Sequence, residues 1–214
     1  MRKTLGCTVA ALGLAVLGGA LSPAQAATTH TVPTLGVTHQ AAHRANQLTL
    51  SQLTDKVLEH VQAAYPTVST LMLASGESPS GPTTDMAKVT RWDFVLNNSV
   101  AGPIGSVEVA ADLDGTVSGI TPHAQRWGGV LPISLPITLQ PAEAYAILAG
   151  AGHADAFQFV SLVKPLVPDA RTQYHFSNVR GGSQGWAVDM NKPHEVRPIL
   201  GADAGLGALQ PGDC

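Results

Sequence analysis

The stretch from Thr90 to Leu96 reads TRWDFVL, with two large aromatic residues two positions apart. Because successive side chains of a β-strand point to opposite faces, this spacing predicts a half-buried strand. Trp92 and Phe94 then face the core, whereas Asp93 faces away from it. We therefore expect the core to lie on one face of a sheet.

Two more strands and a tight turn are predicted after this stretch. Apolar and polar residues alternate over residues 107–113, and residues 116–120 form the returning partner strand. Asp114 and Gly115 stand between them, and both residues tolerate the positive φ that a tight hairpin requires. The three strands therefore make an antiparallel arrangement.

A helix is predicted before these strands. Thr49 and Gln52 fit a capping box, in which each side chain bonds to the other residue's backbone N–H. An apolar stripe at helical spacing follows, made of Leu50, Leu53, Val57, Val61 and Ala64. Pro66 ends the helix, because proline lacks the backbone N–H that a helix needs. Residues 68–74 form a short apolar strand.

A second set of elements repeats this order. Its helix is predicted to begin at Thr138, with Pro141 in the first turn and glycines at its end. Its strands are predicted over residues 157–163, 173–179, 185–190 and 196–200. Tyr174 and Phe176 match the aromatic pair of the first set, which indicates an internal duplication. Chance alternation in unrelated strands is the alternative.

These patterns predict an α+β fold of two tandem helix-plus-antiparallel-sheet units, each a helix followed by at least three strands. Whether the two sheets join edge to edge or pack separately is left open. The expected organisation is a signal peptide (1–26), a flexible lead (27–47), a first unit (48–121), a connector (122–137), a second unit (138–200) and a disordered tail (201–214).

The repeated pattern resembles the PepSY domain and related cystatin-like folds. In the first unit the resemblance lies in Trp92 and Phe94, Val107-Glu108-Val109 and Asp114-Gly115-Thr116-Val117; in the second it lies in Tyr174, Phe176 and Ala187-Val188-Asp189. The second unit departs from the pattern at residues 192–195, where Lys-Pro-His-Glu replaces the glycine turn. The resemblance implies a protein outside the cell membrane that regulates or inhibits secreted peptidases.

The N-terminus is typical of a secretory signal peptide. Arg2 and Lys3 precede an apolar run over residues 10–21, and small residues follow. The run is shorter than the ~20 apolar residues of a membrane-spanning helix. We expect cleavage after Ala26 and a secreted chain that has no membrane association.

Charge and cysteine content exclude several classes of function. The net charge of −3 becomes −5 when Arg2 and Lys3 leave (−3 minus 2), which argues against nucleic-acid and anionic-lipid partners. No dinucleotide or P-loop motif occurs, so no cofactor is expected. Cys214 is then the only cysteine. Cys214 either forms an intermolecular link, or is a reactive thiol, or is an inert terminal residue.

Two histidine arrangements are candidate chemical sites. His175 and Asp189 are predicted on neighbouring strands, facing away from the core, where they form either a general base with its orienting carboxylate or a solvated pair. His39 and His43 have the i, i+4 spacing of metal ligands on a helix. No glutamate lies between them as in HExxH, so adventitious or no metal binding is the alternative.

Arg126 and Trp127 in the glycine-rich connector are the candidate binding residues, because arginine and tryptophan commonly dominate protein interfaces. Trp127 is expected either on the surface or as a wedge between the units. The leading interpretation is a secreted, non-enzymatic binding protein that modulates or inhibits an extracellular peptidase. The alternatives are a secreted enzyme of unrecognised type that uses His175 and Asp189, and a structural or adhesion module of the cell envelope.

Overall fold

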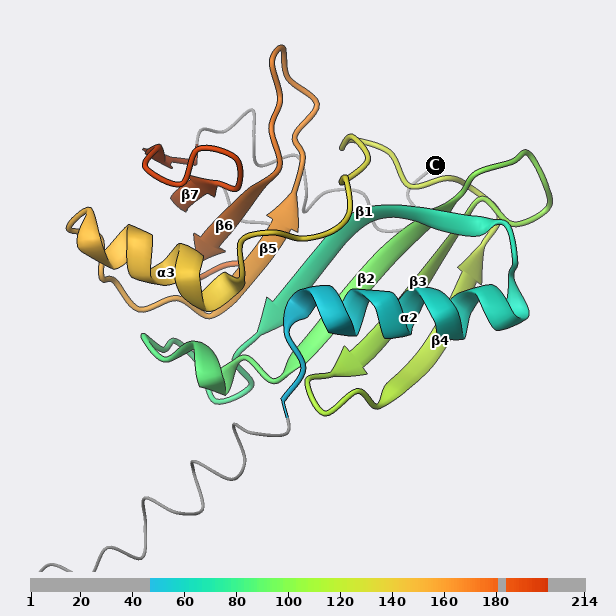
Figure 1. Ribbon diagram of the computed structural model, residues 1–214, viewed down its shortest axis with the longest axis horizontal. Helices are drawn as coiled ribbons and strands as arrows, with labels where there is room; N and C mark the ends of the chain where they lie inside the picture. The colour runs from blue at the N-terminus through green and yellow to red at the C-terminus, as the bar shows by residue number, and fades with distance from the viewer. Residues whose placement is uncertain (1–46, 181–183, 200–214) are drawn as a thin grey trace, which may run out of the picture.

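The computed structural model describes residues 47–180 and 184–199. The expected signal peptide, nearly all of the lead and the C-terminal tail lie outside these residues, as do His39, His43 and Cys214. One antiparallel sheet of eight strands, in the order β4-β3-β2-β1-β5-β6-β7-β8, forms the body of the molecule. The two α-helices of the described residues lie on the same face of this sheet (Figure 1).

The elements occur in the order that the sequence predicts. They are α2 (Leu50–Ala64), β1 (Val68–Glu77), the 3-10 helix η1 (Met86–Lys88), β2 (Arg91–Asn98), β3 (Ser106–Asp112), β4 (Val117–His123), α3 (Pro141–Gly150), β5 (Phe159–Val163), β6 (Gln173–Ser177), β7 (Gly185–Asp189) and β8 (Val196–Pro198). The predicted helices and strands are thus confirmed as elements, with bounds that differ by a few residues.

The predicted fold class, two tandem helix-plus-antiparallel-sheet units, is wrong. The fold is mainly β, and all eight strands belong to one continuous sheet. The halves join where residues 73–77 of β1 pair with residues 159–163 of β5. This pairing satisfies the edge of β5 and half of the facing edge of β1, which two separate sheets would have left open. The two-residue alternation along a strand shows which of its faces is apolar, but it carries no information about which strand pairs with which at their edges.

The core lies between the sheet and the two helices. The predicted inward aromatic residues are buried there, with Trp92, Phe94, Tyr174 and Phe176 exposed by 1, 0, 0 and 3%. The Trp92 ring lies over Gly76, where an added Cβ would come within 2.8 Å of the ring. Glycine is therefore required at this position by close packing.

The two helices are tied together at their N-termini. The capping box of α2 is confirmed, since Thr49 N–H donates to Gln52 Oε1 (2.9 Å) and Gln52 N–H donates to Thr49 Oγ1 (3.2 Å). Leu50 N–H donates to Gln140 Oε1 at 2.9 Å, across 90 residues of sequence. The helix predicted from Thr138 begins instead at Pro141, because Gln140 has the extended conformation of an N-cap.

The connector between β4 and α3 crosses from one face of the sheet to the other. Val130 packs on the helix-free face, whereas Ile133 and Ile137 belong to the core under the helices. Ile133 N–H donates to Leu71 O at 2.9 Å, beside the part of β1 that β5 leaves unpaired. The short length of β5 thus provides the gap through which the connector passes.

Candidate binding surfaces

A row of polar side chains crosses the helix-free face at the middle of the sheet. Asp93, Ser75, Ser161 and His175 are successive register partners on β2, β1, β5 and β6. The hydroxyl oxygens of Ser75 and Ser161 are 3.1 Å apart and share a hydrogen bond. At this register position the junction between the two halves of the sheet is therefore polar on the helix-free face, beside the apolar pair of Leu73 and Val163.

His175 and Asp189 lie on the helix-free face but do not form the predicted pair. His175 is opposite Ala187, and Asp189 is opposite Gln173, so the two are diagonal neighbours. The amide Nε2 of Gln173 donates to His175 Nε2 at 2.7 Å. Asp189 Oδ1 accepts from the backbone N–H groups of residues 191 and 192 at 2.7 and 2.9 Å. The carboxylate therefore fixes a turn instead of orienting the imidazole.

The surroundings of His175 also differ from the prediction. Its exposure is 5%, so it is not on an open sheet surface. A pocket of about 460 Å³ beside it is lined by Arg171, Asp189 and Arg197 among others. Arg171 lies 3.5 Å from Asp189, and Arg197 donates to Gln173 Oε1 at 2.9 Å. Both arginines of this pocket are thus already bound to polar groups of the chain.

Arg180, which the sequence analysis did not single out, links the two halves of the sheet. It follows β6, and its guanidinium donates to Glu77 on β1 (2.6 Å) and to Asp93 on β2 (3.1 Å). It also lies over the Phe159 ring, 5.4 Å from the centroid. Burial alone lowers the pKa of Arg180, but its hydrogen bonds to the two carboxylates outweigh burial and raise the pKa.

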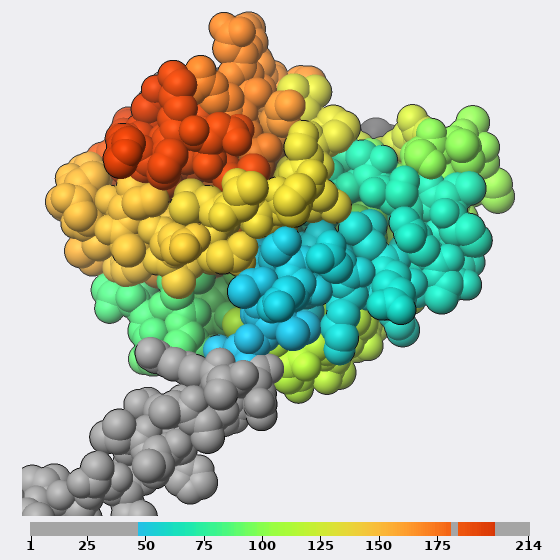
Figure 2. Space-filling model, viewed as in Figure 1, coloured from blue at the N-terminus to red at the C-terminus, as the bar shows by residue number. Residues whose placement is uncertain are grey.

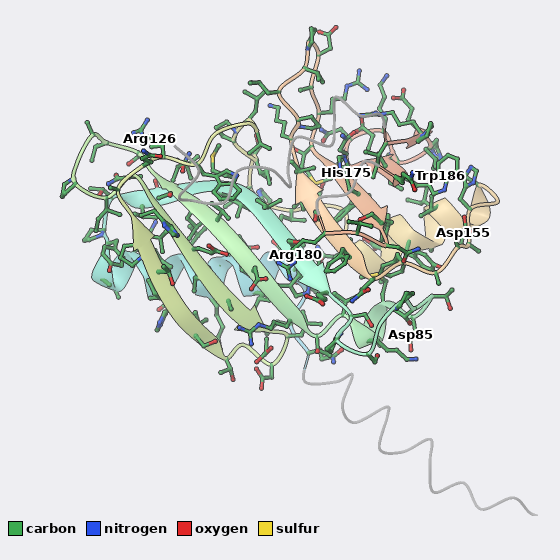
Figure 3. All side chains as sticks on the ribbon, turned by 180° about the vertical axis from the view of Figure 1, so that it is seen from behind. Asp85, Arg126, Asp155, His175, Arg180 and Trp186 are labelled. Carbon is green, nitrogen blue, oxygen red and sulfur yellow. The ribbon has the colours of Figure 1, made fainter. Side chains whose placement is uncertain are left out.

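The connector holds Arg126 and Trp127 differently. Trp127 is half-buried and packs against the cluster of Met72, Val95, Val130 and Val163 on the helix-free face. Arg126 is exposed and lies at one end of the sheet, away from His175 (Figure 3). Trp127 is therefore a packing residue of this face, and of the two residues only Arg126 is fully exposed.

The backbone around Arg126 is fixed on both sides. Trp127 N–H donates to Asn97 Oδ1 (2.8 Å), and Asn97 Nδ2 donates back to Trp127 O (2.9 Å). Ser106 Oγ donates to Gln125 O at 2.7 Å. A Cβ at Gly105 would lie 2.4 Å from Arg126 N, so this close approach requires glycine. Arg126 is thus an exposed cation on a rigid backbone.

Strand β4 leads into this segment and forms one edge of the sheet. Among the described strands it pairs with β3 alone, and its sequence from Val117 to His123 contains no Asp, Glu, Lys or Arg. Asp112 N–H donates to Thr116 O at 2.9 Å, so the backbone groups of Thr116 face β3. Because successive residues of an antiparallel strand direct their backbone groups to opposite sides, those of Val117 face the free edge. A bulge and Pro122 limit the length over which another strand can pair.

Within residues 47–180 and 184–199, no group of three or more His, Cys, Asp or Glu side chains is arranged to hold a metal ion. Neither described α-helix combines the length and the apolar character that crossing a bilayer demands.

Comparisons with protein families, with curated proteins and with solved structures give no match for this chain.

Proposed function

We propose that the chain is exported and acts as a non-enzymatic binding protein that modulates or inhibits an extracellular peptidase. The observations that carry the binding role are the edge position of β4 among the described strands and the rigidly held, exposed Arg126 three residues after its end. The signal-peptide pattern supports export, and the resemblance to PepSY domains supports a peptidase as the partner.

The β4 edge suits an extended segment of a partner protein. An added strand forms main-chain hydrogen bonds with the edge, which give affinity without side-chain chemistry. The edge lacks the charged side chains that normally prevent such pairing. The bulge restricts the contact to a few residues, so the edge alone gives a weak interaction.

Arg126 supplies the second contact. Exposed arginines at the centre of an interface frequently dominate its binding energy. Because the segment around Arg126 is already ordered by Asn97 and Ser106, binding loses little backbone entropy. We therefore place Arg126 in contact with a carboxylate or a carbonyl of the partner, next to the added strand.

The enzymatic alternative has lost its geometric basis. It needs a base and an orienting carboxylate in contact, and Asp189 is instead bonded to the backbone of its own turn. The envelope alternative depends on Cys214, which lies outside the described residues. No described contact favours either alternative over protein binding.

Affinity capture from culture supernatant tests the proposal. The baits are the chain from Ala27, its Arg126→Ala variant and a Lys88→Ala control, which removes an exposed cation on η1. We expect a peptidase whose activity changes when the wild-type chain is added, with affinity reduced at least about tenfold by Arg126→Ala and unchanged by Lys88→Ala.

Two results would overturn the proposal. One is the absence of any peptidase with altered activity. The other is equal binding by all three baits. Sedimentation of the free chain provides a further check. Pairing of β4 with a second copy of the chain would give a concentration-dependent dimer. Such a dimer would reassign the β4 edge to self-association.

A further inference from the structure

Strand β6 is buried on both faces, although the described helices cover only one face of the sheet. Figure 2 shows that covered face, with α2 in blue and α3 in yellow. The two aromatic side chains of β6 belong to the core under these helices. Its other residues, Gln173, His175 and Ser177, lie on the helix-free face with exposures of only 4, 5 and 8%. Glu108, on the interior strand β3 and the same face, has a side chain that is 46% exposed. The helix-free face is thus open over β3 and closed over β6.

The described neighbours of His175 do not account for its burial. Its register partners are small, namely Ser161 on β5 and Ala187 on β7. The connector covers this face two residues further along the sheet, over the apolar cluster that contains Val163. Arg180 reaches away from β6, toward carboxylates on β1 and β2. Another segment therefore has to cover β6.

This segment has to offer hydrogen bonds. Strands that are buried on both faces usually consist of continuous apolar residues, whereas β6 alternates polar and apolar ones. Buried polar side chains are nearly always hydrogen-bonded. A backbone that lies close to the sheet supplies both donors and acceptors, and glycine allows the closest approach. A glycine-rich segment of chain therefore fits the chemistry of this surface.

The chain passes this surface where it leaves the described residues. Strand β8 pairs with β7, the neighbour of β6, and Ile199 N–H donates to Gly185 O at 3.0 Å. Fifteen residues follow Ile199 (214 minus 199), numbered 200–214. Extended at ~3.3 Å per residue they span about 50 Å, whereas β8 and β5 are only about 15 Å apart, at ~4.8 Å per strand. The segment is thus long enough to cross both β7 and β6.

Charge also favours residues 200–214 as the cover. They contain two aspartates and four glycines but no Lys or Arg. On the described side, Arg171 and Arg197 line the pocket beside β6. Arg171 is shared between two carboxylates, whereas Arg197 donates to the neutral side chain of Gln173. A carboxylate that approaches Arg197 adds a charge-assisted hydrogen bond, which is stronger than a bond between neutral groups.

We propose that residues 200–214 turn back after β8 and lie on the helix-free face across β7 and β6. The Asp203 carboxylate pairs with Arg197, and the backbone beyond it covers His175. Asp203 follows Ile199 by four residues, so a single turn brings it back to β8. The proposal gives an ordered position to residues that the sequence analysis expects to be disordered. It leaves the β4 edge and Arg126 open and does not depend on their function.

The test places a nitroxide spin label beside Asp203 in the chain from Ala27. Ala204→Cys is combined with Cys214→Ser, so that residue 204 carries the only thiol. We expect the label to broaden the amide resonances of His175 and Ala187 strongly, and those of Glu59 on the exposed side of α2 weakly. Stronger broadening at α2, or no broadening of either region, would overturn the proposal.

A mixed sample distinguishes this chain's own segment from that of a second copy. Spin-labelled chain without isotope labels is mixed with isotope-labelled chain that carries no nitroxide. We expect the resonances of His175 and Ala187 to remain sharp in this mixture. Broadening there would assign the cover to a second copy and overturn the proposal.

Variants test the predicted ion pair. In the spin-labelled chain, Asp203→Asn should reduce the ratio of docked to undocked segment by about twofold to fivefold, as for a partly exposed ion pair. The matched control Asp213→Asn removes the same charge further along and should leave the broadening unchanged. Equal effects of the two variants would contradict the assignment of Asp203.

A label-free measurement covers the case in which the nitroxide itself prevents docking. Residues 200–214 are replaced by a Gly/Ser segment of equal length, and mass spectrometry follows the modification of histidines by diethyl pyrocarbonate. The rate at His175 should rise severalfold relative to the exposed His60 on α2. An unchanged ratio of the two rates would show that other residues cover His175 and would overturn the proposal.

Discussion

The two faces of the sheet are built in different ways. The covered face is a continuous apolar core, in which Phe94 and Tyr174 are fully buried under the helices. The helix-free face carries a polar row and is tied by Arg180, which reaches carboxylates 87 and 103 residues away in sequence. The comparison shows that the apolar face is determined by local alternation, whereas the polar face depends on distant contacts. Substitutions on the two faces should therefore differ in their effect on stability.

The largest expected effect is on the covered face. Phe94→Ala removes a fully buried ring and should lower the free energy of unfolding by about 3–5 kcal/mol. Val95→Ala, one residue along on the other face, should cost less, within about 0.5–3 kcal/mol. Urea unfolding of both variants measures the difference. Equal losses would show that the two faces contribute alike.

Trp127→Ala tests the packing of the connector on the helix-free face. Because Trp127 is half-buried against an apolar cluster, we expect a loss of about 2 kcal/mol, below the range for fully buried tryptophans. Trp127→Phe should restore part of this loss. Thermal unfolding of both variants is the measurement. Unchanged stability in Trp127→Ala would instead make Trp127 a contact residue for a partner.

Tyr174→Phe tests a polar contact inside the apolar core. The hydroxyl of Tyr174 donates to Leu139 O at 2.6 Å, so its removal should cost about 1 kcal/mol near neutral pH. Burial, followed by repulsion from Glu143, raises the pKa of Tyr174. Its stabilisation is therefore complete below the unfolded pKa of about 10 and is lost as the pH rises above that value.

The pH dependence of the free energy of unfolding isolates the contribution of Tyr174. Urea unfolding at about pH 8 and at about pH 11 should show a smaller alkaline loss in Tyr174→Phe than in the wild-type chain. Burial also raises the pKa of Tyr145, so some alkaline loss should remain in the variant. Identical alkaline losses in the two proteins would contradict the assignment.

The smallest effect is expected at Arg180. Its side chain is 53% exposed, so Arg180→Ala should cost at most about 1 kcal/mol despite two ion pairs and the Phe159 contact. The cost should decrease with added salt, because exposed charges are screened. Arg180→Lys is the matched control, since it keeps the charge but loses the two-carboxylate geometry. A salt-independent loss would indicate that packing on Phe159 dominates.

Local patterns account for most of what the sequence predicted correctly. The capping box at Thr49 and the aromatic pair Trp92 and Phe94 depend on neighbours within a few residues, and each is present. The start of α3 was wrong by three residues, because Gln140 precedes Pro141: the residue before a proline disfavours the helical conformation, and proline favours the first helical position. The bond from Leu50 N–H to the Gln140 side chain, by contrast, spans 90 residues and could not be read from the local sequence.

The candidate sites show where this kind of prediction ends. Alternation placed His175 and Asp189 on the correct face, but a two-residue offset in register keeps them apart. The pairing of β1 with β5 and the reach of Arg180 both arise from tertiary contacts. Sequence periodicity carries no signal for either of them, so these features required the structure.

The pairing of β1 with β5 has a consequence for synthesis of the chain. Ser75 meets Ser161 across 86 residues, so the inner edge of β1 has no partner until β5 has been made. A nascent chain that has completed β4 already has its helix and four strands but exposes an unsatisfied strand in the centre of the future sheet. Such an edge favours intermolecular pairing, so holding the chain unfolded until both halves are available protects it from aggregation.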